Sequence, residues 1–170
     1  ALEAGVRVWD AVAGREWVEA PCWEDLEQRD TPLSTRVAYA NQGERRGGIY
    51  LSLHSNAVGN TLAGPSQSAR GVEVYTSRGQ TGSDEIATSI LRAMRRHVTP
   101  DLGIRSGDRT DGDPDREAGF YVLTKTAGPA VMGEIGFFTN IDDARFLDSI
   151  EGQRRIAQGY LDGVLPFLQD

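Results

Sequence analysis

The stretch Ile49-Tyr50-Leu51-Ser52-Leu53-His54-Ser55-Asn56-Ala57 is an apolar, β-rich run that contains one of the two histidines of the chain. Isoleucine, tyrosine and alternate leucines suit a pleated, buried backbone, so residues 49–53 predict a short interior strand with His54 at its carboxyl end. In open α/β sheets, ligands bind in the crevice outside the carboxyl ends of the strands. His54 is therefore a candidate metal ligand or catalyst. The alternative is a structural histidine held by hydrogen bonds.

A second apolar run, Pro129-Ala130-Val131-Met132-Gly133-Glu134-Ile135-Gly136-Phe137-Phe138-Thr139-Asn140, carries a carboxylate among valine, methionine, isoleucine and phenylalanine side chains. Burial of an unpaired charge is costly, so a glutamate in such a run usually has a metal, a cation or a raised pKa. The run predicts a second strand with Glu134 as a candidate functional residue. The alternative is a glutamate at the end of the strand that is turned to solvent.

Two blocks, Leu51-Ser52-Leu53-His54-Ser55-Asn56-Ala57 and Gly133-Glu134-Ile135-Gly136-Phe137-Phe138-Thr139-Asn140, together resemble signature blocks of the zinc-dependent N-acetylmuramoyl-L-alanine amidases, which cut peptidoglycan. Further blocks agree with this family in order and spacing: Arg36-Val37-Ala38-Tyr39-Ala40-Asn41, Gly71-Val72-Glu73-Val74-Tyr75 and Pro129-Ala130-Val131. The resemblance runs from about residue 30 to the end of the sequence. Residues 75–81 are similar to versions from phages and prophages.

In the family that the chain resembles, two histidines and one glutamate hold Zn²⁺, and a further glutamate is the general base. The resemblance assigns the second zinc histidine to His54 and the catalytic glutamate to Glu134, with Asn56 as a candidate substrate-binding residue. Zinc lowers the pKa of its bound water to about 7 and polarises the scissile carbonyl, while a carboxylate carries the proton to the leaving amine. The resemblance implies hydrolysis of the amide bond between N-acetylmuramic acid and L-alanine, in lysis or remodelling of the cell wall.

The other two zinc ligands of the family, a histidine and a glutamate, precede its first helix, which we assign to residues 1–12. Neither ligand is visible in the sequence. No histidine precedes His54, and Glu3 falls inside the predicted helix, beyond the place of the family's glutamate. His97 lies in the last turn of a distant predicted helix, where its default role is structural. We therefore expect residues 1–170 to be an amidase catalytic domain without its N-terminal strand and first ligand turn.

Two other functions stay open at this point. A non-catalytic or degenerate peptidoglycan-binding module would keep the substrate groove but not the metal. A carboxypeptidase-like zinc hydrolase would share the metal chemistry and cut a different peptide. Zinc content distinguishes a binding module from an amidase. The products formed from peptidoglycan distinguish a carboxypeptidase-like hydrolase from an amidase.

The composition favours one soluble domain with its own core, because the chain has 170 residues and 39% of them are hydrophobic. A net charge of −7 argues against nucleic acid as a partner. No apolar run is long enough to span a bilayer. The single Cys22 forms no intrachain disulfide. We expect a monomer that acts on peptidoglycan at the bacterial cell wall, as a secreted, periplasmic or phage lysis protein.

Hydrophobic periodicity predicts helices alternating with strands. Helices are expected at residues 1–12, from Pro32 to Ala40, from Ser83 to Pro100, after an N-cap at Asn140, and at the C-terminus; strands are expected at residues 16–20, 49–53, 71–76, 120–123 and in the Glu134 run. Helices between strands indicate an α/β fold: a single domain with a mixed or mostly parallel sheet flanked by helices on both faces.

Residues 101–117 form a long predicted loop that is rich in Gly, Asp and Arg. A loop of this length inside a compact domain is uncommon and often functional. Its arginines, Arg105, Arg109 and Arg116, are candidates for binding carboxylates of a peptide. The alternative is that each is paired with the surrounding aspartates.

Overall fold

The computed structural model describes residues 9–10, 15–16, 32–42, 48–58, 68–105, 107 and 112–168. The strands are β1 (Trp9–Asp10), β2 (Arg15–Glu16), β3 (Tyr50–Asn56), β4 (Val72–Thr76), β5 (Arg116–Glu117) and β6 (Ala130–Phe137). The helices are α1 (Leu33–Ala40), α2 (Gly82–Val98), α3 (Tyr121–Lys125), α4 (Ile141–Asp148) and α5 (Ile150–Val164), which a 3-10 helix, Leu165–Phe167, follows.

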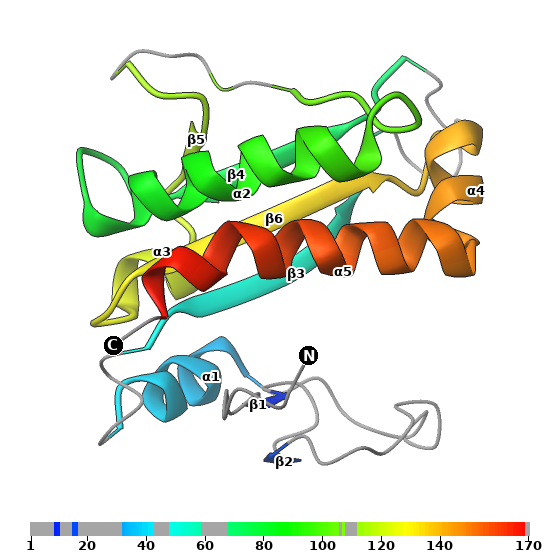
Figure 1. Cartoon of the computed structure of the whole chain (residues 1–170). Coiled ribbons are helices and arrows are strands. Elements are labelled where there is room, and N and C mark those ends of the chain that lie inside the picture. Colours follow the sequence, from blue (N-terminus) through cyan, green and yellow to red (C-terminus); the bar gives the residue numbers. More distant parts are fainter. Residues whose placement is uncertain are drawn as a thin grey trace.

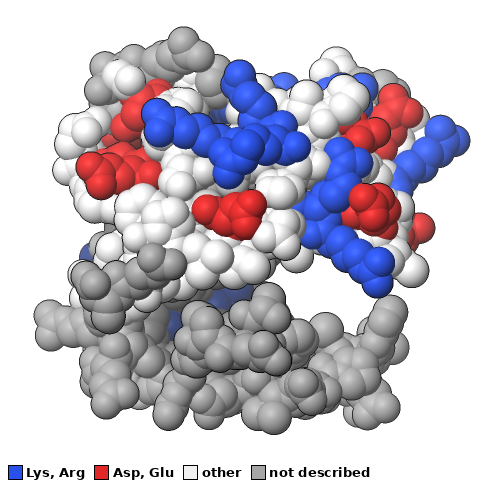
Figure 2. Space-filling view, viewed as in Figure 1, with Lys and Arg blue, Asp and Glu red and all other residues white. Residues whose placement is uncertain are grey.

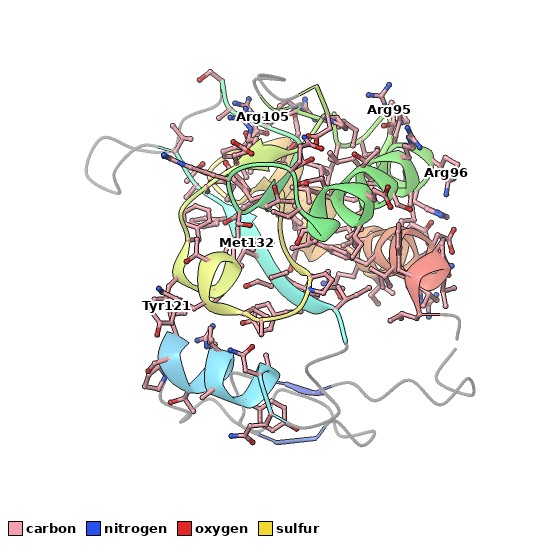
Figure 3. The ribbon with its side chains drawn as sticks, turned by 90° about the vertical axis from the view of Figure 1, so that its left-hand side faces the viewer. Arg95, Arg96, Arg105, Tyr121 and Met132 are labelled. Atoms are coloured by element: carbon pink, nitrogen blue, oxygen red, sulfur yellow. The ribbon has the colours of Figure 1, made fainter. Side chains whose placement is uncertain are left out.

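Four strands form the main sheet, in the order β3-β6-β4-β5. Strand β6 runs parallel to β3 and antiparallel to β4, and β5 runs parallel to β4, so the sheet is mixed. Helices α2 and α5 lie side by side across one face (Figure 1). In the view turned by 90°, the sheet lies between α3 on one side and α2 and α5 on the other (Figure 3). The predicted single α/β domain with helices on both faces is confirmed.

The main core lies between the sheet and helices α2 and α5. Successive side chains of a strand point to opposite faces, so Val131 and Ile135 of β6 point into this core while Met132 and Glu134 point to the other face. The core residues are Val72, Val74, Ile86, Ala87, Ile90, Leu91, Met94, Val98, Leu102, Val131, Ile135, Phe146, Tyr160 and Val164. A smaller cluster on the opposite face comprises Val37, Val122, Leu123 and Ala130.

Local sequence signals set the ends of two helices. Asn140 is the N-cap of α4, as predicted, and its side chain accepts hydrogen bonds from the backbone N–H groups of Asp142 and Asp143. Helix α2 begins one residue before Ser83, because Thr81 is its N-cap and forms a capping box with Asp84. The helix predicted from Ser83 therefore starts one residue earlier, at Gly82.

The predicted strand at residues 120–123 is in fact the start of helix α3, Tyr121–Lys125. A short apolar run does not distinguish a strand from a buried helix by periodicity. Val122 and Leu123 are both buried against the sheet, and this tertiary contact selects the helix.

The N-terminal predictions fall mostly outside the described residues. Trp9–Asp10 pairs antiparallel with Arg15–Glu16, so the helix predicted for residues 1–12 is wrong at these two positions. Of the strand predicted at residues 16–20, only the first residue is described, and it lies in β2.

The segment predicted as a loop at residues 101–117 is not wholly irregular. Ile104 forms a bridge to Val72, and Arg116–Glu117 pairs with Tyr75–Thr76 as strand β5. These contacts place both ends of the segment along β4.

Basic and acidic side chains lie interspersed on the face formed by α2 and α5 (Figure 2). The exposed Arg92, Arg95 and Arg96 of α2 belong to a solvated helix surface. None of the described helices combines the length and the apolar character that crossing a membrane requires.

Two glycines of α5 test how closely this helix packs against α2. A Cβ on Gly163 would lie 2.6 Å from Ile90 Cα, whereas a Cβ on Gly159 would lie 2.6 Å from Met94 Sδ. Backbone cannot move aside but a methionine side chain can, so we expect Gly163→Ala to lower the unfolding free energy by roughly 1–3 kcal/mol. The unfolding free energy of Gly159→Ala should stay within about 1 kcal/mol of the wild-type value. Urea denaturation measures both, and equal costs would contradict this packing.

Candidate active site

A row of three ionisable side chains crosses strands β3, β6 and β4 of the sheet. His54 of β3 is the register partner of Glu134 of β6, and Glu134 is the register partner of Glu73 of β4. Paired residues on neighbouring strands point to the same face, which here is the face opposite α2 and α5. His54 and Glu134 therefore lie side by side on one face of the sheet.

His54 lies two residues before the end of its strand, because β3 continues to Asn56. The side chain is exposed, and its Nε2 lies 2.8 Å from the hydroxyl of the buried Ser52. The register shifts between His54 and Asn56, so that Asn56 pairs with Phe137. His54 is thus exposed near the carboxyl end of β3, and the carboxyl ends of strands are where α/β sheets place their ligand sites.

Glu134 is half buried, and its Oε2 is buried without a hydrogen-bond partner among the described residues. Burial raises the pKa of Glu134, and the negative charge of Glu73 raises this pKa further. The carboxylate thus does not simply point to solvent, which was the alternative in the sequence. A carboxylate with a raised pKa and a free oxygen is suited to accepting a proton.

Glu73 was not among the candidate residues in the sequence. In the structure its side chain is only 4% exposed and has four partners. Its Oε1 accepts a hydrogen bond from Arg105 Nε at 2.7 Å and pairs with the guanidinium of Arg116 at 3.2 Å. Its Oε2 accepts hydrogen bonds from Asn56 Nδ2 and from the Tyr75 hydroxyl, both at 2.9 Å. Burial, and then the bond to Glu73, raises the pKa of Tyr75 to about 12, so Tyr75 remains a donor.

The Glu73 network includes three residues for which the sequence suggested other partners. Asn56 was a candidate for substrate binding, and its amide is engaged with Glu73 and with the backbone N–H of Ala57. Arg105 and Arg116 were expected to bind peptide carboxylates or neighbouring aspartates, and both pair with this glutamate. Arg109 lies outside the described residues. The signal that could have found Glu73 is its alternation with Val72 and Val74, opposite the core.

Asp143 of α4 holds the strand ends around this row. Its buried Oδ2 accepts hydrogen bonds from the backbone N–H groups of Gly71, at 2.7 Å, and Phe137, at 3.0 Å. Gly71 immediately precedes β4, and Phe137 ends β6. This carboxylate thereby fixes the two strands that carry Glu73 and Glu134.

The described residues supply one candidate zinc ligand at this row. Their only group of three metal-ligating side chains is Asp84, Asp113 and Asp115, which does not include His54. His97, the other histidine, is 2.8 Å from Asp162 Oδ2, in the structural role that was predicted for it. His54 fits a zinc ligand by its imidazole and position, but the described residues alone do not make a complete three-ligand zinc site.

Residues 23–165 match the sequence pattern of the N-acetylmuramoyl-L-alanine amidases. The match covers well over half of the chain, and the chain therefore belongs to the N-acetylmuramoyl-L-alanine amidase family. The predicted resemblance is confirmed by this match.

Two proteins of Bacillus subtilis are similar to this chain, and one of them is named as an amidase. The protein YqiI of Bacillus subtilis (strain 168) is 30% identical over 135 residues, which are 78% of this chain and 56% of that protein. The germination-specific N-acetylmuramoyl-L-alanine amidase of the same strain is 24% identical over 147 residues, which are 86% of this chain and 52% of that protein. The chain thus spans about half the length of each of these relatives.

Among solved structures, an N-acetylmuramoyl-L-alanine amidase from Clostridium difficile 630 superposes with a TM-score of 0.67 at 25% sequence identity. The superposition covers 83% of this chain and 67% of the other. The fold described above is therefore that of a solved amidase.

Proposed function

We propose that this protein hydrolyses the amide bond between N-acetylmuramic acid and L-alanine in peptidoglycan, and that it acts at the bacterial cell wall. The pairing of His54 with Glu134 carries this proposal. An exposed imidazole lies beside a carboxylate that has a raised pKa and an unpartnered oxygen, in a chain of the amidase family. The composition agrees, because a net charge of −7 suits a partner other than a polyanion.

The proposed cofactor is Zn²⁺, with His54 as one of its ligands. When bound, zinc polarises the scissile carbonyl and lowers the pKa of its water. Of the described residues, Ser52 fixes the imidazole of His54 by the 2.8 Å contact with Nε2. Such a contact orients a metal-ligating histidine.

Glu134 is the proposed general base. Its carboxylate takes a proton from the attacking water as the water oxygen bonds to the lactyl carbonyl carbon. The same carboxyl then gives this proton to the leaving nitrogen of L-alanine as the C–N bond breaks. The proton removed from water therefore ends on the new amine, and Glu134 returns to its charged state.

The Glu73 network is proposed to position this base. Glu73 is fixed by Arg105, Arg116, Asn56 and Tyr75, so its charge lies at a constant place beside Glu134. Asn56 contributes to the site through this contact, and as a substrate-binding residue it remains a proposal.

The test uses the complete protein, as encoded, on purified peptidoglycan with mass spectrometry of the products. We expect glycan chains with intact lactyl groups and stem peptides with a new N-terminal L-alanine. Binding without release of peptides would identify a non-catalytic module. Loss of only C-terminal amino acids would identify a carboxypeptidase-like hydrolase.

Metal removal tests the cofactor separately. Dialysis against a zinc chelator should abolish release of L-alanine-ended peptides, and stoichiometric Zn²⁺ should restore it. Elemental analysis of the untreated protein should then find zinc. Full activity in a protein shown to be free of zinc would contradict the proposed metal. It would not contradict the proposed substrate.

A further inference from the structure

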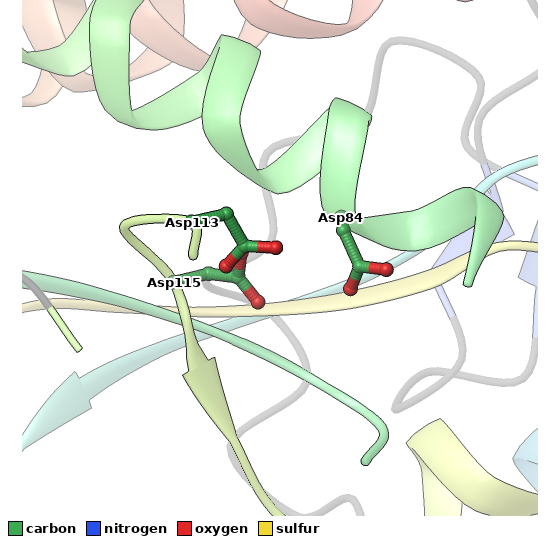
Figure 4. A group of neighbouring side chains, drawn as sticks. All are labelled: Asp84, Asp113 and Asp115. Carbon is green, nitrogen blue, oxygen red and sulfur yellow. The ribbon is translucent and has the colours of Figure 1, made fainter. Parts of the chain in front are cut away.

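Three aspartates from two separate segments converge beside the first turn of α2. Asp84 belongs to that helix, and Asp113 and Asp115 precede strand β5. One carboxylate oxygen from each lies within 4.8 Å of the others. Figure 4 shows the three side chains turned into the same space.

Two of these carboxylates are almost completely buried, and each leaves one oxygen without a partner. Asp84 is 5% exposed and Asp115 is 2% exposed. Their Oδ2 atoms accept hydrogen bonds from the Thr81 backbone N–H and the Thr76 hydroxyl, respectively. The Oδ1 atoms of Asp84, Asp113 and Asp115 are buried and have no hydrogen-bond partner within the described part of the chain.

Buried negative charge of this kind requires compensation. An uncompensated carboxylate in a protein interior is strongly unfavourable, and like charges at one site oppose each other. No lysine or arginine of the described residues forms an ion pair with any of the three aspartates. The guanidinium of the adjacent Arg116 instead pairs with Glu73. A cation or shared protons must therefore balance the charge.

This cluster is separate from the row of His54 and Glu134. Thr76, which contacts Asp115, alternates with Glu73 and Tyr75 along β4 and so points to the face covered by α2. Glu73 and Glu134 point to the opposite face. The acidic cluster therefore does not supply ligands to a zinc ion at His54.

We propose that Asp84, Asp113 and Asp115 bind a hard divalent cation, of which Ca²⁺ is the best fit. All the donors are oxygens, as Ca²⁺ and Mg²⁺ prefer, and zinc prefers nitrogen and sulfur. The three oxygens lie within 4.8 Å of one another, which is close enough for them to converge on one Ca²⁺ at its usual distance of about 2.4 Å, with water completing the shell. The ion links the start of α2 to the segment before β5 and stabilises this end of the fold.

The experiment is calorimetric titration of the complete protein, with zinc present, with CaCl₂ and separately with MgCl₂ at constant ionic strength. We expect one Ca²⁺ per chain with a dissociation constant of roughly 0.1–1 mM, as in extracellular sites with few protein ligands. At 5 mM, Ca²⁺ should raise the melting temperature by roughly 3–6 °C. The His54→Ala variant should respond equally, which keeps this test independent of the proposed amidase activity.

The double variant Asp113→Asn and Asp115→Asn keeps the size of both side chains and removes their charges. It should lose the calcium-dependent rise in melting temperature, whereas the exposed Asp148→Asn should keep it. Absence of binding by either cation in wild type would overturn the proposal. A melting temperature that rises on acidification but does not respond to cations would also overturn the proposal, because protons would then balance the charge. An undiminished calcium response in the double variant would also overturn it.

Discussion

Glu134→Gln should lower kcat/KM on peptidoglycan by about 100-fold or more, because the variant cannot accept a proton from the attacking water. The amide has the same shape as the carboxylate, so the strand and the neighbouring His54 should remain in place. Zinc content should be unchanged, since Glu134 is proposed as a base and not as a ligand. The initial rate of peptide formation at saturating and at limiting peptidoglycan concentration gives kcat and kcat/KM for both proteins.

Stability provides the second readout for this variant. Burial raises the pKa of Glu134, so its charged form is disfavoured in the folded protein. The contribution of the Glu134 carboxyl to folding stability is fully present below its ordinary pKa. This contribution is lost as the pH rises through the raised pKa of the folded protein. A neutral amide removes this loss, so Glu134→Gln should melt no lower than wild type at pH 7. The exposed Glu85→Gln is the control for activity. Near-normal hydrolysis by Glu134→Gln would remove the general-base assignment.

Glu73→Ala should have the largest effect on stability, about 3 kcal/mol of unfolding free energy. Removing one partner of a buried ion pair costs about 3–5 kcal/mol because the other charge is left uncompensated. Arg105 and Arg116 are 39% and 33% exposed, and water can therefore hydrate them in part. This places the expected cost at the lower end of the range. Urea denaturation measures it.

The pH profile distinguishes positioning from simple stability. The charge of Glu73 is one cause of the raised pKa of Glu134. Glu73→Gln removes this charge, so Glu134 should lose its proton at lower pH, and the acidic limb of kcat/KM should move to lower pH. Glu85→Ala, an exposed change on α2, should cost less than about 1 kcal/mol and leave the profile unchanged. An unmoved acidic limb in Glu73→Gln would argue that Glu73 has only a structural role.

Much of the fold follows from local patterns that the sequence contains. The 3.6-residue spacing of Ile86, Ile90 and Met94 predicts α2, and alternation of Val72 and Val74 predicts β4. The cap at Asn140 needs only its own side chain and the next backbone N–H groups. The motifs around His54 and Glu134 are contiguous, so both candidate residues are visible without the structure.

Tertiary structure alone decided how these pieces meet. The strand register places Glu73 beside Glu134, although 61 positions of sequence separate them. The packing of the chain also brings Arg105 and Arg116 to Glu73, and it brings Asp84 close to Asp115. The short run at Tyr121 is a helix because the sheet beneath it offers a buried surface. Local propensity was sufficient wherever neighbours along the chain supply the contacts. It failed where the deciding partner comes from a distant segment, because side-chain period fixes a face but not the strand that lies beside it.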